Sequence, residues 1–186
     1  MTYSVCVFCG SRFGDAPAFR LAAFALGTAL AKQDMRLVYG AGDVGLMGEV
    51  ARATQQLGGE TFGVIPIHLQ KTEVGKTDLT SYVVTETMHE RKKVMFMNAD
   101  AIVALPGGPG TLDELFEVLT WRQLGLHAKP VFVLNTARYW DGLVTLLQGI
   151  CDRGFASPSF LDFYQMVDTV DDLAARLRSA RQLSHE

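Results

Sequence analysis

The sequence predicts an α/β protein built on a doubly wound parallel sheet with helices on both faces. Short β-branched and apolar runs alternate along the chain with segments whose apolar residues recur at helical spacing. Strands that alternate with helices in this way form parallel sheets. Three glycine-rich turns, at Gly10, 40–45 and 107–110, each follow a predicted strand. Because ligands bind beyond the carboxyl ends of parallel strands, we expect these turns to border a nucleotide-sized pocket.

The individual elements follow from hydrophobic periodicity and from start and stop residues. Strands are expected at 4–8, 37–39, 61–65, 82–84, 101–105 and 131–134. Helices are expected at 17–32, from 45 to about 57, at 88–97, from the turn at 107–110 to 124, at 140–153 and at 171–181. The polar segment 69–80 has no clear period and predicts a surface loop.

Length and charge limit the class of protein. A chain of 186 residues with 48% hydrophobic residues is expected to form one domain, 1–186. A formal charge of −3 and a pI near 5.8 argue against a nucleic-acid or membrane-surface partner, since both favour a basic face. No apolar stretch approaches the ~20 residues of a bilayer span, and no basic leader precedes the first strand. We therefore expect a cytoplasmic protein with a small-molecule ligand.

Cysteine and histidine spacing gives no sign of a metal or redox centre. The chain contains three cysteines, Cys6, Cys9 and Cys151, and four histidines, His68, His89, His127 and His185. An odd number of scattered cysteines does not resemble a disulfide framework, so reduced thiols are expected. The C-x-x-C match at 6–9 has no second pair for zinc and lies in a predicted strand. No histidine pair has metal-ligand spacing, and we expect no metal or redox cofactor.

The segment 106–114, PGGPGTLDE, joins a buried strand to an amphipathic helix. Glycines let backbone N–H groups approach a ligand closely, and a helix start favours negative charge, so a phosphate is the expected ligand. Thr111 and Glu114 allow a second interpretation, because Thr-x-x-Glu at a helix start is also a capping box. The spacing alone leaves Glu114 open between capping the helix and facing a ligand.

Arg91 lies in a predicted helix on the same side as Met88 and Met95. A guanidinium on an apolar face needs a partner, and either a structural carboxylate or a ligand phosphate would serve. The turn at 40–45 matches G-x-G-x-x-G, the dinucleotide fingerprint. That match is weak, because the next strand ends in Pro66-Ile67-His68 and not in the acidic residue that binds a ribose.

Five motifs in order along the chain resemble the Lonely Guy (LOG) family. They are YGAG at 39–42 leading into GLMG at 45–48, MHERK at 88–92, PGGPGTLDE at 106–114, TWRQLG at 120–125 and Lys129-Pro130. Members of this family are cytokinin riboside 5′-monophosphate phosphoribohydrolases, long mislabelled as lysine decarboxylases. The resemblance implies a Rossmann-like fold, a homodimer, and hydrolysis of nucleoside 5′-monophosphates to a free base and ribose 5-phosphate.

The resemblance also implies roles for particular residues. Its catalytic pair falls on Arg91 and Glu114. We add Ser11, beside the first strand, and Met88, on the Arg91 face, to the implied nucleotide-binding residues. The full set is Ser11, Glu73, Met88, Lys92, Gly108, Pro109, Gly110, Thr111, Leu112, Asp113 and Thr120. Glu73 aligns less securely than the others, and a solvated charge on a surface loop is its alternative interpretation. Ala41 stands where the family commonly has a third glycine, and Asp43 beside it would repel a phosphate. We therefore assign the phosphate to the turn at 108–111.

Cleavage of an N-glycosidic bond builds positive charge on the ribose, which a fixed carboxylate can stabilise. Glu114 is the expected carboxylate, and one can suffice because a purine delocalises the charge of the leaving group. Arg91 could bind phosphate, keep Glu114 ionised or donate to the substrate. The alternative is a non-catalytic carrier of a nucleotide or phosphorylated cofactor, and a dinucleotide-dependent oxidoreductase is a weaker third hypothesis.

Overall fold

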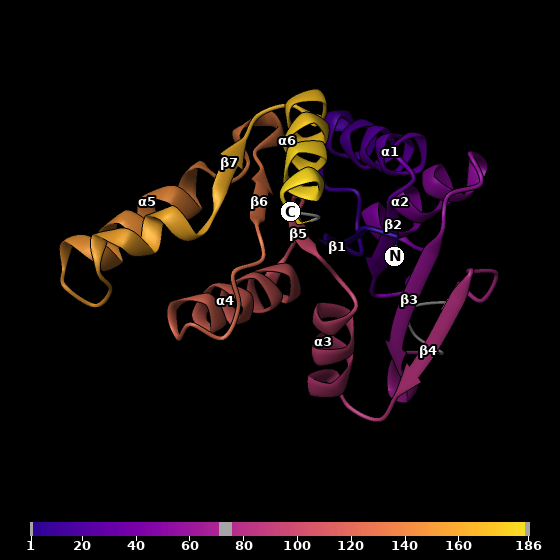
Figure 1. Ribbon diagram of the computed structural model, residues 1–186, viewed down its shortest axis with the longest axis horizontal. Helices are drawn as coiled ribbons and strands as arrows, with labels where there is room; N and C mark the ends of the chain where they lie inside the picture. Colours follow the sequence, from indigo (N-terminus) through magenta and orange to yellow (C-terminus); the bar gives the residue numbers. More distant parts are fainter. Residues whose placement is uncertain (1, 71–75, 185–186) are drawn as a thin grey trace.

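The computed structural model of the chain describes residues 2–70 and 76–184 (Figure 1). The strands are β1 (Ser4–Phe8), β2 (Arg36–Tyr39), β3 (Thr61–Pro66), β4 (Ser81–Thr85), β5 (Ala101–Ala104), β6 (Val131–Leu134) and β7 (Gln165–Val167). The α-helices are α1 (Pro17–Lys32), α2 (Gly45–Gln56), α3 (Met88–Met97), α4 (Pro109–Gln123), α5 (Asp141–Asp152) and α6 (Val170–Leu183). Three short 3₁₀ helices are η1 (Ile67–Leu69), η2 (Thr136–Arg138) and η3 (Pro158–Phe163).

Within the described residues the strands form one seven-stranded sheet in the order β4-β3-β2-β1-β5-β6-β7. Every neighbouring pair is parallel, from Phe62 beside Ser81 at one edge to Leu134 beside Val167 at the other. The chain runs outward from β1 to β4 and then returns to continue from β5 on the other side of β1. The predicted doubly wound α/β fold is therefore confirmed, with its switch point between β1 and β5.

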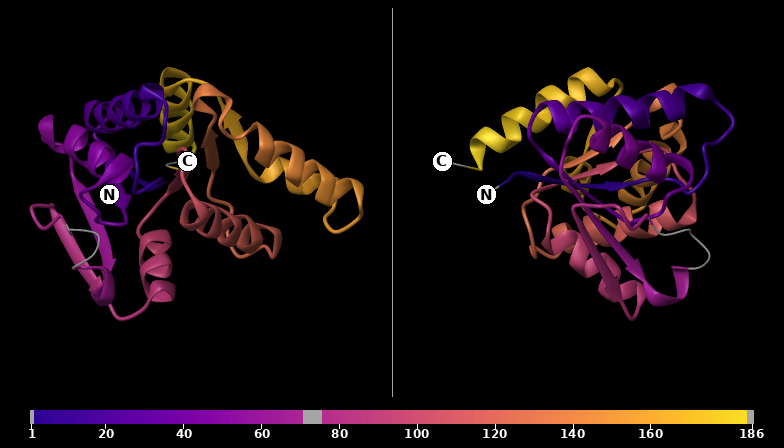
Figure 2. Two further views of the ribbon diagram at one scale, coloured as in Figure 1. Left: turned by 180° about the vertical axis from the view of Figure 1, so that it is seen from behind. Right: turned by 90° about the vertical axis from the view of Figure 1, so that its right-hand side faces the viewer.

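Helices cover both faces of the sheet (Figures 1 and 2). Helices α1, α2 and α6 pack on one face, and α3, α4 and α5 pack on the other. Strand β1 shows why: Val5 and Val7 face the first layer, while Cys6 and Phe8 face the second. All five β1 residues are buried, and each large apolar side chain so buried contributes ~1.5–3 kcal/mol to folding. Two apolar layers thus fix β1 and its following turn.

Of the two interpretations of Thr111 and Glu114, the capping box is wrong. The helix begins at Pro109 with Gly108 as its N-cap, so Thr111 is its third residue and Glu114 its sixth. Proline suits the first helical position because its missing N–H would be unpaired there in any case, and it starts the helix before Thr111. A capping box does occur one helix earlier, where Thr87 accepts from Glu90 N at 3.2 Å and Glu90 accepts from Thr87 N.

Strand β7 and the three 3₁₀ helices were not predicted. Strand β7 has only three residues, an exposed Gln165, a half-buried Met166 and a buried Val167, too few for a clear alternation. The other predicted strands and helices are confirmed to within two residues at their ends. None of the helices in the described ranges is long and apolar enough to cross a membrane.

Candidate active site

A cavity of about 230 Å³ opens at the carboxyl ends of β1, β3 and β5. Its walls come from the loop after β1, the start of α2, η1, the start of α3 and the first two turns of α4. The lining residues are Cys9, Gly10, Ser11, Met47, Leu69, Met88, Arg91, Gly108, Pro109, Gly110, Thr111, Asp113 and Glu114. The structure thus brings together residues more than 100 positions apart, at the rim where a ligand was expected.

The backbone of Gly10 ties the glycine-rich turns together. Its N–H donates to Pro106 O at 3.0 Å, and its carbonyl accepts from Leu46 N at 3.0 Å. Gly107 packs against this junction, because a side chain there would meet the Thr111 hydroxyl and the Gly10 nitrogen. Glycine is therefore required at Gly107 by close packing, and the floor of the cavity is a fixed backbone surface.

The first turn of α4 is open to the cavity. Side chains added at Gly108 or Gly110 would meet no atom within 4 Å, and both residues line the cavity. The unpaired N–H groups of a helix start carry partial positive charge and point out of the helix end. This end of the cavity therefore has the geometry and the potential to hold a phosphate.

Arg91 is buried, with 4% of its surface exposed, and it lines the same cavity. Its Nη2 donates to Gly40 O at 2.7 Å, its Nε donates to Val64 O at 3.1 Å, and its Nη1 lies 3.8 Å from Met88 Sδ. The sequence offered a carboxylate or a phosphate as partner, and the structure adds backbone carbonyls at the ends of β2 and β3. A side chain at Gly40 would overlap the guanidinium, so glycine there makes room for Arg91.

Glu114 lines the cavity from the second turn of α4 and is half-buried. Its negative charge acts on the nearby Cys9, whose pKa is raised chiefly by burial and further by Glu114, against an opposing effect of Arg91. Cys9 is therefore a protonated wall residue at neutral pH. The cavity places a carboxylate and a guanidinium beside the open first turn of α4.

Lys92 points elsewhere. Its Nζ lies 2.9 Å from Asp113 Oδ2 and 3.2 Å from Glu117 Oε2, which joins α3 to α4. Burial alone would lower the pKa of Lys92, but hydrogen bonds to Asp113 and Glu117 outweigh burial and raise it. Asp113 lines the cavity and Lys92 does not. A nucleotide contact of Lys92 stays a prediction.

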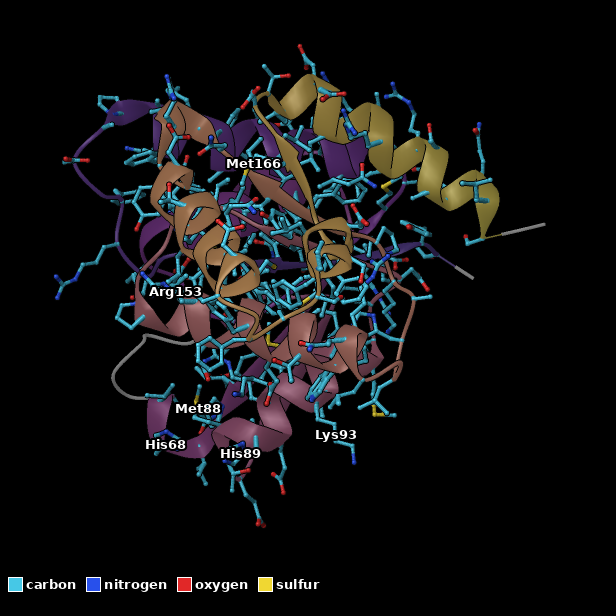
Figure 3. All side chains as sticks on the ribbon, turned by 90° about the vertical axis from the view of Figure 1, so that its left-hand side faces the viewer. His68, Met88, His89, Lys93, Arg153 and Met166 are labelled. Atoms are coloured by element: carbon cyan, nitrogen blue, oxygen red, sulfur yellow. The ribbon has the colours of Figure 1, made fainter. Side chains whose placement is uncertain are left out.

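The remaining predicted site residues fall into three groups. Ser11 and Met88 line the cavity, and Figure 3 shows Met88 at the start of α3. Leu112 packs against the apolar layer below α4 and Thr120 is exposed farther along that helix, so neither lines the cavity. Glu73 lies outside the described residues.

The turn after β2 lies outside the cavity wall. Ala41 is fully buried with a φ of 57°, its methyl packs against Gly63, and its carbonyl accepts from Lys76 N at 2.9 Å. Asp43 pairs with Arg52 at 2.8 Å and lies 3.8 Å from Lys76 Nζ. Ala41 and Asp43 thus both contact Lys76.

Sequence reasoning missed four wall residues as site residues: Cys9, Gly10, Met47 and Leu69. Met47 and Leu69 bring an apolar surface to the cavity. The only sequence signal for these four residues was their position, because each lies in a segment that follows a strand at the carboxyl edge of the sheet. Apolar residues at such positions look like ordinary core residues.

The chain matches the family model described as "Possible lysine decarboxylase" over residues 47–177. It is 41% identical over 177 residues to the probable cytokinin riboside 5′-monophosphate phosphoribohydrolase LOG4 of Oryza sativa subsp. japonica, covering 95% of this chain and 77% of that protein. It is 46% identical over 154 residues to the cytokinin riboside 5′-monophosphate phosphoribohydrolase LOG7 of Arabidopsis thaliana, covering 83% of this chain and 71% of that protein.

A solved structure of the molybdenum cofactor binding protein from Rippkaea orientalis has the same fold. Its TM-score is 0.73 at 20% identity, over 96% of this chain and 97% of that one. A likeness at this identity shows the architecture alone. The family model and the curated relatives go further, and the chain belongs to the LOG family.

Proposed function

We propose that this protein hydrolyses the N-glycosidic bond of nucleoside 5′-monophosphates, AMP or cytokinin riboside 5′-monophosphates, to a free base and ribose 5-phosphate. In a cytokinin-producing cell this reaction activates the hormone. The observation that carries the proposal is one cavity that combines Glu114, Arg91 and the open end of α4. The names of the curated relatives support the same reaction.

The geometry suggests how the substrate lies. The 5′-phosphate binds the N–H groups at 108–111, which places the ribose beside Glu114, one turn farther along α4. The base then lies toward Met47, Leu69 and Met88, whose apolar side chains form the opposite wall. Arg91 is buried beside this wall, where it donates to the carbonyl of Gly40 after β2 and to the carbonyl of Val64 in β3.

In the proposed reaction the bond between C1′ and the base nitrogen breaks, and its electron pair passes into the purine ring. Positive charge grows on C1′ and is stabilised by the Glu114 carboxylate. A water oxygen bonds to C1′, Glu114 accepts the water proton, and that proton passes to the departing base. The residues of the chain supply each of these steps without a cofactor.

The test is incubation of purified protein with AMP, adenosine and a panel of other nucleoside monophosphates, followed by chromatography of the free base. Because the α4 turn binds phosphate, we expect AMP to give a kcat/KM at least ~100-fold above that of adenosine. Comparable values for the two substrates would overturn the phosphate assignment. The panel also shows whether an N6-apolar substituent, worth a few kcal/mol at most, is preferred.

A carrier of phosphorylated ligands is the second candidate, and the shared fold of the molybdenum cofactor binding protein is the observation in its favour. A carrier would bind AMP and release it intact, whereas a hydrolase releases adenine. Glu114 and Arg91 in one cavity favour hydrolysis, because binding alone does not need a carboxylate beside an anion site.

We further propose that the chain forms one domain over 1–186, works in the cytoplasm and assembles as a homodimer. We propose α1 or α4 as the seam, because both carry exposed apolar side chains: Phe24 on α1 is 42% exposed, and Leu124 at the end of α4 is 66% exposed. Such residues would be covered by a second subunit. Light scattering should give twice the chain mass of 20.4 kDa, and a mass of one chain would contradict the dimer.

A further inference from the structure

A second cavity, which we call the switch-point crevice, adjoins the candidate active site. It measures about 450 Å³ and lies between the loop after β1 and the loop after β5. Gly10, Ser11, Gly108 and Pro109 line both cavities. The two spaces therefore meet at the turn to which we assign the 5′-phosphate.

The order of the strands sets the direction from one cavity to the other. Leu69, which follows β3, lines only the active-site cavity, and Tyr139, which follows β6, lines only the crevice. Strands β1 and β5 lie between β3 and β6 in the sheet. Consider a nucleotide with its base toward Leu69 and its 5′-phosphate at 108–111. The side of that phosphate that faces away from the base then points toward the crevice.

The residues that line the crevice suit a ligand in which an anionic group is followed by a planar ring. Arg12 lines it and is exposed, and among the described residues nothing forms a hydrogen bond or ion pair with its guanidinium. Phe13, 40% exposed, lines it as well. Phe19 and Tyr139 pack edge to face at 5.5 Å and form an aromatic wall. A cation beside aromatic faces is complementary to a second phosphate followed by a planar group.

We propose that the switch-point crevice binds the group attached to the 5′-phosphate of an extended adenine nucleotide, as in a dinucleotide. The adenosine monophosphate half occupies the active-site cavity, Arg12 binds the second phosphate, and Phe13 and Tyr139 contact the second nucleoside. This inference rests on the proposed function only for the position of the first phosphate. The ligand competes with AMP.

The experiment measures inhibition of AMP hydrolysis by diadenosine pyrophosphate, in which two adenosines are joined by two phosphates. We expect competitive inhibition by the wild-type protein, with an inhibition constant below the KM for AMP. Arg12→Ala should raise that constant at least ~10-fold, the scale of one charge-assisted contact. Its KM for AMP should stay within about twofold, because AMP has no second phosphate to contact Arg12.

Arg153→Ala is the matched control, because Arg153 is exposed beyond the far end of α5 (Figure 3) and does not line the crevice. It should leave both constants unchanged. An equal inhibition constant in wild type and Arg12→Ala, or no inhibition at 100 times the KM, overturns the proposal. If AMP is not hydrolysed at all, the proposed function fails separately, and calorimetric titration of diadenosine pyrophosphate into the two proteins still decides whether Arg12 binds it.

Discussion

The guanidinium of Arg91 donates to the Gly40 carbonyl at 2.7 Å, and this contact joins α3 to the turn after β2. Its Nε donates to Val64 O at 3.1 Å, so one side chain satisfies carbonyls at the ends of two strands. Arg91 thus supports the backbone around the cavity that it also lines. Its structural and chemical roles can be separated experimentally.

Replacement of Arg91 by alanine should destabilise the protein as well as abolish activity. Each buried carbonyl left without a donor costs ~1–3 kcal/mol, so we expect the free energy of unfolding to fall by about 3 kcal/mol. Urea unfolding measures this. Lys93→Ala, an exposed change on the same helix (Figure 3), should cost no more than about 0.5 kcal/mol. A loss below about 1 kcal/mol for Arg91→Ala would show that water replaces the guanidinium at both carbonyls.

Glu114→Gln tests the carboxylate. Since Glu114 does not occupy a capping-box position, the variant should stay folded within about 1 kcal/mol of wild type. Loss of the charge beside C1′ should lower kcat for AMP at least ~100-fold with little change in KM. Glu117→Gln makes the same change one turn along α4, where the side chain pairs with Lys92, and it should retain at least a third of the activity. More than about a tenth of wild-type kcat in Glu114→Gln would rule out a catalytic role.

Tyr139→Phe tests the turn to which we assign the phosphate. The Tyr139 hydroxyl donates to Gly107 O at 2.6 Å. In a trans peptide the N–H of the next residue, here Gly108, points away from that carbonyl oxygen. Tyr139 lines the crevice and not the active-site cavity. Its hydrogen bond therefore turns the Gly107 carbonyl toward the crevice and the Gly108 N–H toward the proposed phosphate position. In the proposed reaction the turn holds the phosphate equally in the ground state and in the transition state. We therefore expect KM for AMP to rise about fivefold at nearly constant kcat.

Tyr164→Phe, a half-buried change beside β7, is the control for this measurement and should alter neither constant. An unchanged KM in Tyr139→Phe would mean that the packing of Gly107 against Thr111 and Gly10 is enough to fix the turn.

His127 should make stability depend on pH. Burial lowers its pKa below 6.5, helped by Arg122 and Lys129 and opposed by a hydrogen bond to Val118 O. The unfolded chain then binds more protons than the folded chain just below pH 6.5, so the free energy of unfolding falls as the pH drops through this range. Urea unfolding at pH 7.5 and 5.5 should show a smaller difference for His127→Gln than for wild type. His89→Gln, at an exposed position, should keep the full difference.

Much of the fold could be predicted because its signals are local. Apolar runs and helical periodicity located six of the strands and all six α-helices in the described ranges. The glycine-rich turns at Gly10 and 107–110 located the rim where the cavity opens, whereas the turn at 40–45, also expected there, does not line it. Glu114 and Arg91 were expected to act together, and the structure places both on one cavity. Their chemical roles stay predictions until the variants are measured.

Other features could not be predicted because they depend on contacts between distant segments. Thr-x-x-Glu occurs at the start of both α3 and α4, yet only the one at α3 is a capping box. Pro109 starts α4 two residues before Thr111, so Thr111 is not the N-cap. No side-chain pattern shows that backbone carbonyls would satisfy Arg91. The crevice beside Tyr139 arises only when β6 is placed next to β5.

The position of β1 has a consequence for how the chain folds. Its two neighbours are β2, nearby in sequence, and β5, which pairs Val5 with Ala101. While the ribosome makes the intervening segment, a fully buried central strand has a partner on only one side. Such long-range parallel pairing is slow and leaves an edge open to aggregation. Closure of β5 against β1 is also the event that brings α4 and its glutamate to the cavity.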